Sequence, residues 1–214
     1  MTVENNSTNK NIFNLRKEKL NGYKLEYFEE LKRVYLGIDE DIFINFFTKL
    51  NEIREQGKSI YIAGNGGSYS NADHMVCDLG KNLDNLEKDF KGFKSHLLGG
   101  SLSTLTALSN DFHYNEIFSK RLELLGESGD GVICLSVSGK SGNILRLLQM
   151  AKTKKIKTFG IYGFGGGDAL PLTDFPIALT SDNYGVVEDI QTIIFHTFVY
   201  SYRNEIFQDE IGKT

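Results

Sequence analysis

The residues of this chain that could do chemistry gather in one stretch, YIAGNGGSYSNADHMVCDLGK at 61–81. It contains a glycine-rich turn at 64–67 and, on the helix expected after it, His74 and Asp78. A His and an Asp four residues apart lie on one face of a helix, where they can jointly hold Zn²⁺ or form a hydrogen-bonded pair without metal. The turn can bring backbone N–H groups close to a ligand, and the positive end of the following helix favours an anion, of which phosphate is the natural first candidate.

The stretch GVICLSVSGKSGNILRLLQMAK at 131–152 repeats this arrangement of strand, turn and helix. Its turn carries three hydroxyls, from Ser136, Ser138 and Ser141. Either turn alone is typical of an ordinary strand-to-helix connection, but two in one domain would place hydroxyl and amide donors at the carboxyl ends of two strands. Neutral donors without a dedicated Lys or Arg suit a phosphate monoester on a sugar.

The elements that must position these turns alternate between strands and helices. Apolar residues at helical spacing predict helices between the strands. The same pattern predicts a last helix that begins at about Val186. Five apolar runs predict strands, near 60–63, 93–98, 132–135, 157–164 and 175–180. The alternation predicts an α/β fold, a three-layer α/β/α domain with a five-stranded parallel, flavodoxin-like sheet. In that strand order the first and third strands, which carry the two turns, are neighbours at the ligand crevice.

The chain divides into three predicted parts. Residues 1–20 are polar and Asn-rich and predict a flexible tail, residues 21–57 predict helices with broad aromatic faces, and residues 58–207 predict the phosphosugar-binding domain. Helices this aromatic can cover the sheet or pack against a second subunit, so we expect an oligomer.

Composition narrows the classes of partner. A formal charge of -4, from 24 basic and 28 acidic residues, gives no basic excess, so nucleic acid is not favoured as a partner. The apolar runs are too short to cross a bilayer, and the N-terminal region lacks the apolar segment of a signal peptide, so we expect a cytoplasmic protein. Cys77 and Cys134 match no paired metal-ligand spacing and are expected to be reduced, buried thiols.

Five motifs together resemble the sugar isomerase (SIS) domain family. They are GNGGS at 64–68, the following helix with His74, SND at 109–111, SxSGxSxN at 136–143 and a Gln in the final helix. The resemblance spans about residues 23–202 and points to the phosphoheptose isomerase branch, which converts sedoheptulose 7-phosphate to a glycero-manno-heptose 7-phosphate for surface polysaccharide such as lipopolysaccharide or capsule. It implies substrate contacts at these positions of the chain: Asn65, Gly66, Gly67, Ser68, Asn110, Asp111, Ser136, Val137, Ser138, Ser141 and Gln191.

The chain departs from the family pattern in its catalytic and metal-binding set. The family has a His and a Glu four residues apart on the first helix, and a Gln and a His eight residues apart on the last. These positions hold His74 and Asp78, then Gln191 and Val199. A valine neither binds metal nor moves a proton, so the metal set that the resemblance leaves is His74, Asp78 and Gln191. Zn²⁺ is the candidate ion, and no cofactor is strictly required.

Two further residues of the last helix are candidates for the missing function. At 100° per residue, His196 lies about 140° around the helix from Gln191, so the two would not share a face. Glu188, three residues before Gln191, does share that face and is a candidate carboxylate. His196 is the obvious substitute for the absent histidine, and it could instead point toward a neighbouring subunit's site or be a packed histidine.

The leading hypothesis is an aldose–ketose isomerase for a sugar phosphate. The serine turn and the 64–68 turn would anchor the phosphate, Asp78 or Glu188 would be the base, and His74 or a bound metal would be the electrophile. A non-catalytic phosphosugar-binding or regulatory protein of the same family is the alternative, as is an isomerase for another sugar phosphate. The resemblance implies a homotetramer or homodimer.

Overall fold

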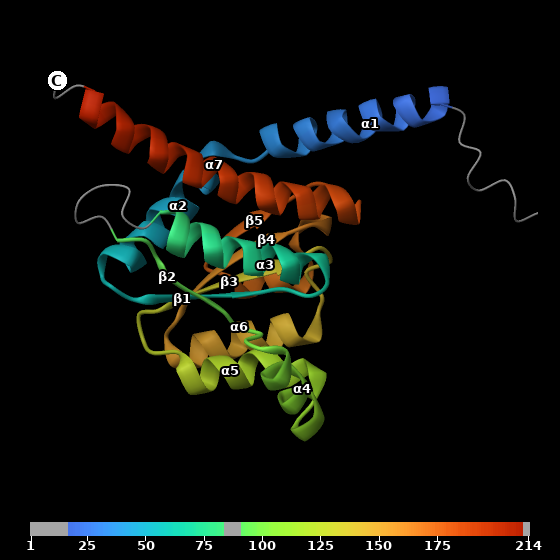
Figure 1. Cartoon of the computed structure of the whole chain (residues 1–214). Helices are drawn as coiled ribbons and strands as arrows, with labels where there is room; N and C mark the ends of the chain where they lie inside the picture. Colours follow the sequence, from blue (N-terminus) through green and yellow to red (C-terminus); the bar gives the residue numbers. More distant parts are fainter. Residues whose placement is uncertain (1–16, 84–90, 212–214) are drawn as a thin grey trace, which may run out of the picture.

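The computed structural model of the protein describes residues 17–83 and 91–211 of the 214-residue chain. Its middle layer is a five-stranded parallel sheet in the order β2-β1-β3-β4-β5 (Figure 1). The strands are β1 (Ser59–Ala63), β2 (Lys94–Leu97), β3 (Gly131–Ser136), β4 (Lys157–Tyr162) and β5 (Phe175–Ala178). The predicted flavodoxin-like order is therefore confirmed. The first and third strands are direct neighbours, with Ala63, the last residue of β1, paired to Cys134 two residues before β3 ends.

Helices cover both faces of the sheet (Figure 1). One face carries α1 (Lys17–Leu36), α2 (Glu40–Glu55), α3 (Gly67–Cys77) and α7 (Tyr184–Ile211). The other face carries α5 (Ile117–Leu125) and α6 (Gly142–Lys154), with α4 (Leu102–Asp111) beyond them. Short helical turns are η2, a π-helical turn (Asp78–Asn82), and two 3₁₀ segments, η3 (Tyr114–Glu116) and η4 (Phe164–Leu172).

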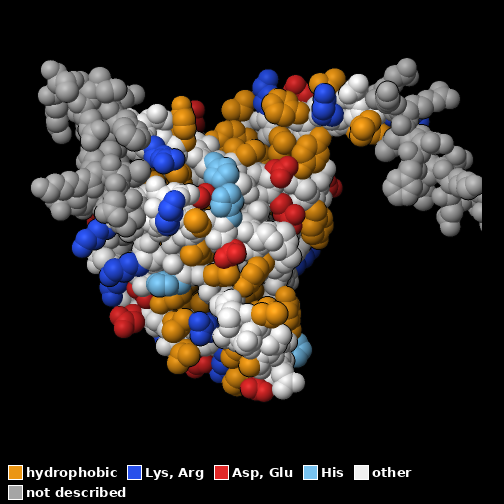
Figure 2. All heavy atoms as spheres, viewed as in Figure 1, with side chains coloured by type: hydrophobic (Ala, Val, Ile, Leu, Met, Phe, Trp, Pro, Cys, Tyr) orange, Lys and Arg blue, Asp and Glu red, His pale blue; other side chains and the backbone are white. Residues whose placement is uncertain are grey.

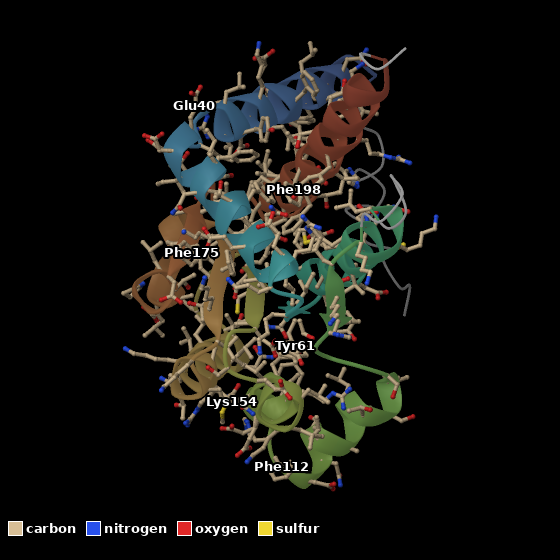
Figure 3. The ribbon with its side chains drawn as sticks, turned by 90° about the vertical axis from the view of Figure 1, so that its left-hand side faces the viewer. Glu40, Tyr61, Phe112, Lys154, Phe175 and Phe198 are labelled. Atoms are coloured by element: carbon tan, nitrogen blue, oxygen red, sulfur yellow. The ribbon has the colours of Figure 1, made fainter. Side chains whose placement is uncertain are left out.

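Two hydrophobic cores lie on opposite sides of the sheet because successive strand side chains point to opposite faces. In β1, Ile60 and Ile62 pack toward α2, α3 and α7, while Tyr61 packs toward α5 and α6. Aromatic rings fill the first core. Phe198 of α7 stacks on Phe47 of α2 with ring centroids 4.2 Å apart, and lies between these helices in Figure 3. The central strand β3 is buried along its whole length.

Some predicted boundaries and burials need correction. Helix α1 begins at Lys17, so the last four residues of the predicted tail 1–20 are helical, and the rest of that tail lies outside the described residues. Strands β4 and β5 end two residues earlier than predicted. Cys77 is exposed, contrary to expectation. Cys134 is buried as expected, and burial raises the pKa of its thiol to about 12.

Helix α1 reaches away from the body of the molecule in Figure 1. Its outer part carries large apolar side chains that remain exposed: Leu20, Tyr23, Leu25 and Phe28. Within residues 17–83 and 91–211, no helix combines the length and the apolar composition needed to cross a bilayer.

Candidate active site

The two turns predicted to bind a ligand lie side by side and are joined by a pair of amides. Asn65, in the turn before α3, donates to the Asn143 Oδ1 at 2.9 Å, and Asn143, at the start of α6, donates back to the Asn65 Oδ1 at 2.8 Å. The Tyr114 hydroxyl also donates to the Asn65 Oδ1, at 2.9 Å. Asn143 is buried, so this reciprocal pair is shielded from water on one side and holds the turns in a fixed relation.

A cavity of about 110 Å³ opens between the two turns and the first part of α7. Seven of its lining residues were singled out in the sequence: Asn65, Ser68, Ser136, Val137, Ser138, Ser141 and Glu188. Leu135 and Tyr184 line it as well and were missed. Leu135 is the last residue of the strand predicted near 132–135, which was expected to be buried for packing and not for ligand contact. Tyr184 stands just before the predicted start of the last helix, and nothing in its spacing marks it as a ligand contact.

The turn before α6 keeps its donors free for an anion. The Ser136 hydroxyl accepts from the Gly139 N–H at 3.1 Å, and the Ser138 hydroxyl accepts from the Lys140 N–H at 3.2 Å, which shapes the turn. Ser141 is the N-cap residue of α6, but its hydroxyl makes no capping bond, and the first turn of α6 has no acidic residue. The positive end of this helix therefore faces the cavity with no carboxylate in the helix's own first turn, although Glu188 of α7 also lines the cavity.

The turn before α3 differs because a carboxylate already lies over it. Gly66 has φ +57, which favours glycine, and a Cβ on Gly67 would lie 2.3 to 2.4 Å from the carboxylate atoms of Glu188. Glu188 comes from α7 and sits at the positive end of α3, where the helix dipole favours a negative charge. A phosphate on this turn would meet that charge.

Gln191 lies beneath this turn and not in the cavity. It is fully buried, and its Oε1 accepts from the Ser68 hydroxyl and from the Asn71 amide, each at 3.2 Å. Its Nε2 donates to the Ile161 carbonyl at 3.3 Å. The side chain is therefore fully engaged in joining α7 to α3 and β4. The sequence interpretation that placed Gln191 with His74 and Asp78 does not match this arrangement.

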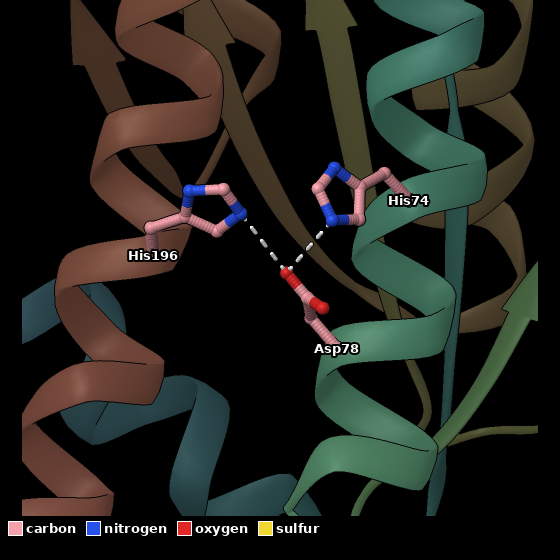
Figure 4. Close-up of side chains that lie close together, drawn as sticks. All are labelled: His74, Asp78 and His196. Carbon is pink, nitrogen blue, oxygen red and sulfur yellow. Dashed lines mark ion pairs between the residues drawn. The ribbon is translucent and has the colours of Figure 1, made fainter.

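The structure instead brings His196 of α7 to His74 and Asp78, which come from the end of α3 and the turn after it (Figure 4). The Asp78 Oδ2 lies 3.4 Å from the His74 Nε2 and 3.3 Å from the His196 Nε2. Asp78 is 5% exposed, whereas both imidazoles are about half exposed, at 51% and 52% of their side chains. Figure 2 shows histidines together on the surface between α7 and α3. His196, the candidate substitute for the absent histidine, thus meets Asp78 of its own chain and is not packed in the core, and the alternative that it points toward a neighbouring subunit's site stays a prediction.

The second oxygen of Asp78 is also held. Asn82, at the end of the π-helical turn η2, donates its amide to the Asp78 Oδ1 at 2.6 Å. This bond orients the carboxylate so that Oδ2 faces both histidines. The π-helical turn breaks the regular 3.6-residue period, and such turns are frequent at functional sites, but no residue pattern in the sequence indicated it.

Asn110 and Asp111 lie away from these groups. Both are exposed at the end of α4, where the Asn110 amide donates to the Asp111 carboxylate at 3.1 Å. They do not line the cavity between the two turns. Val199, at the position of the family's second histidine, packs in the hydrophobic core and is 9% exposed.

The fold and the paired turns define a phosphosugar-binding α/β domain, and comparison with known proteins places it in a family. The SIS domain model matches residues 26–163. The chain is 33% identical to the phosphoheptose isomerase of Helicobacter pylori over 185 residues, which cover 86% of this chain and 92% of that protein. The chain therefore belongs to the SIS domain family, within its phosphoheptose isomerase branch.

Solved structures agree on the fold. The phosphoheptose isomerase of Neisseria gonorrhoeae superposes with a TM-score of 0.77 at 20% identity, covering 87% of this chain and 98% of that one. A phosphoheptose isomerase from Francisella tularensis gives a TM-score of 0.77 at 22% identity, covering 88% and 97%.

Proposed function

We propose that the protein is an isomerase that converts sedoheptulose 7-phosphate to a glycero-manno-heptose 7-phosphate, as the names of its relatives indicate. The observation that carries this proposal is one continuous arrangement along α3 and α7. A phosphate-sized cavity with free hydroxyls lies at one end, and a carboxylate between two imidazoles lies further along the same two helices. Such a product is a precursor for surface polysaccharide.

The distance between the two ends suits an extended sugar phosphate. Gly67 and His74 are seven residues apart on α3, which is about 10 Å along the helix axis. A ligand with its phosphate at Ser138 and Ser141 must therefore extend along α3 and α7 to bring its other end to Asp78. Asn71 lies between them on α3, and its amide donates to the Glu188 carbonyl at 2.8 Å.

The reaction needs a base and a group that stabilises negative oxygen. The base removes a proton from C1, the C2 carbonyl oxygen takes up the negative charge, and an enediolate forms. Transfer of the O1 hydroxyl proton to the negative oxygen on C2, with return of the abstracted proton to C2, gives the aldose. We assign the base to Asp78, with Glu188 as the second candidate, and stabilisation of the oxygen to His74 and His196.

The donor set also fits a metal ion. One ligand atom each from His74, Asp78 and His196 lies within 4.8 Å of the others, and two imidazoles with a carboxylate are a three-residue set that catalytic Zn²⁺ accepts. Here His196, three residues before Val199, supplies the second imidazole that the family takes from that position. A bound Zn²⁺ would polarise the C2 carbonyl oxygen. Asn82 would keep the carboxylate oriented toward it.

We also propose that the protein acts as a homodimer or homotetramer. Helix α1 exposes four large apolar side chains on a segment that projects from the body, which is more than a surface helix normally leaves in water. Residues 21–57 are the proposed oligomerisation segment and 58–207 the phosphosugar-binding domain. A cytoplasmic location stays a prediction.

A direct assay tests the proposed activity. Purified protein is incubated with sedoheptulose 7-phosphate, with and without a chelator, and the aldose phosphate is measured. Turnover that the chelator abolishes and Zn²⁺ restores supports the metal-assisted isomerase, and turnover unaffected by the chelator assigns the role to the imidazoles alone. Absence of turnover with any five- to seven-carbon sugar phosphate would refute the proposal.

A binding or regulatory protein is the second candidate, and the valine at 199 is the observation that favours it. Such a protein needs the serine turn but not the carboxylates. It would bind sugar phosphate with unchanged affinity after substitution of Asp78 and Glu188, and it would yield no product.

A further inference from the structure

An exposed aromatic residue lines the cavity, and a second exposed aromatic ring contacts it. Tyr184, the first residue of α7, lines the cavity and is 59% exposed. The Phe164 ring meets it edge-on, with centroids 5.9 Å apart and planes at 68°, and Phe164 is 46% exposed. Neither residue belongs to the two hydrophobic cores. The pair is therefore apolar surface placed beside an otherwise polar site.

The backbone at Phe164 is held in a conformation that a bulky residue rarely adopts. Its φ is +50°, in the left-handed region, within a run that has glycine at 163 and at 165–167. The Phe164 N–H donates to the Ser181 carbonyl at 2.9 Å, which helps to hold the turn. Glycine would occupy this position without strain, and strain of this kind collects at ligand sites. We therefore attribute the presence of phenylalanine at this position to its ring, since the backbone conformation would favour glycine.

Both rings are tied to the elements that form the cavity. Gly163, next to Phe164, donates its N–H to the Ser136 carbonyl at 3.3 Å, and a Cβ on it would lie 2.6 Å from the Val137 carbonyl oxygen. Tyr184 stands one helical turn before Glu188 on α7. Tyr184 therefore lines the cavity directly, and Phe164 stands behind it in ring contact, next to the strand end that carries Ser136.

We propose that Phe164 and Tyr184 form an aromatic wall against which the C–H groups of the bound sugar pack. This inference rests on the proposed function, because it requires a sugar phosphate in the cavity. Ring faces carry partial negative charge and favour contact with the weakly positive C–H groups of a carbohydrate. The wall adds affinity for the sugar carbons and none for the phosphate.

The test compares two ligands by isothermal titration calorimetry. One is a heptitol 7-phosphate, a sugar-alcohol phosphate that has no carbonyl and cannot react, and the other is inorganic phosphate. The variants are Phe164→Gly, whose backbone suits φ +50°, and Tyr184→Leu. The matched controls are Tyr184→Phe, which keeps the ring, and Phe112→Leu, which removes an exposed ring on α4.

We expect Phe164→Gly and Tyr184→Leu each to weaken heptitol phosphate binding about tenfold. Inorganic phosphate binding should change less than about twofold, and the controls should bind as the wild type does. If all variants bind heptitol phosphate as tightly as the wild type does, the proposed aromatic wall is contradicted. A parallel loss for both ligands would also overturn it, by showing that the rings support the turn. A wild type that binds heptitol phosphate no better than inorganic phosphate would overturn the wall together with the proposed function.

Discussion

The turn before α3 and the turn before α6 both follow buried parallel strands and precede helices that lack a side-chain cap. They differ in what the last helix brings to them. Glu188 of α7 lies over Gly67 in the first turn, whereas the second turn faces the cavity with the hydroxyls of Ser138 and Ser141. A carboxylate directly over a helix N-terminus makes that terminus a less favourable phosphate site. On this basis we propose that the phosphate binds at the α6 turn and that the reacting end of the sugar lies at α3 and α7.

The strongest way to break this comparison is to remove the charge at the reacting end. Asp78→Asn should lower kcat about 10²- to 10⁴-fold, because the amide can neither accept the C1 proton nor carry the charge between His74 and His196. Affinity for heptitol 7-phosphate should change less than about threefold, since the phosphate is held elsewhere. Steady-state kinetics and calorimetry check the two parts. A variant that keeps wild-type kcat would assign the base to Glu188.

Removing a hydroxyl from the turn before α6 should instead lower the affinity for the phosphate. Ser141→Ala should weaken binding of both heptitol 7-phosphate and inorganic phosphate about 10- to 30-fold, because a hydrogen bond to a charged group is lost. Ser70→Ala, an exposed serine close to the other turn, is the matched control and should bind as the wild type does. If Ser141→Ala and the control bind both ligands with equal affinity, the turn before α6 is not the phosphate site.

The amide pair that joins the two turns can be removed while the serine hydroxyls and the Asp78 carboxylate are left unchanged. Asn143→Ala removes both bonds of the reciprocal amide pair with Asn65 and should lower the free energy of unfolding by about 1–3 kcal/mol. A double-mutant cycle with Asn65→Ala, followed by urea denaturation, measures the coupling. If the two changes are simply additive, the pair does not join the turns.

The smallest expected effect sharpens the electrostatic part of the comparison. Glu188→Gln should raise the affinity for inorganic phosphate roughly two- to fivefold at low salt, because a negative charge near the cavity is removed. The gain should shrink as salt is added. Glu29→Gln, an exposed change on α1, controls for net charge. Weaker phosphate binding after Glu188→Gln would show that Glu188 orients the site and does not repel the anion.

Much of the fold could be predicted because buried strands and helices leave strong periodic patterns. The positions of both turns follow from the same patterns, since each turn begins where a strand ends. The tertiary relation between Asn65 and Asn143 could not be predicted, because an asparagine in a turn is common and its partner lies 78 residues away.

The last helix shows where sequence reasoning fails. The helical angle correctly separates His196 from Gln191, and the structure places one on the surface and the other in the interior. The angle does not say which neighbour each face meets. That depends on how α7 packs on α3, so Gln191 lies under Ser68 and His196 meets Asp78. The π-helical turn that orients Asp78 depends on the same packing.

A crystal structure of the Asp78→Asn variant with bound sedoheptulose 7-phosphate tests the central assignment most directly. We predict the phosphate within hydrogen-bond distance of the Ser138 and Ser141 hydroxyls at the start of α6. The C1–C2 end should lie between α3 and α7, next to residue 78 and the two histidines. A phosphate seated on the 64–68 turn, with the carbonyl end at the serines, would contradict the account.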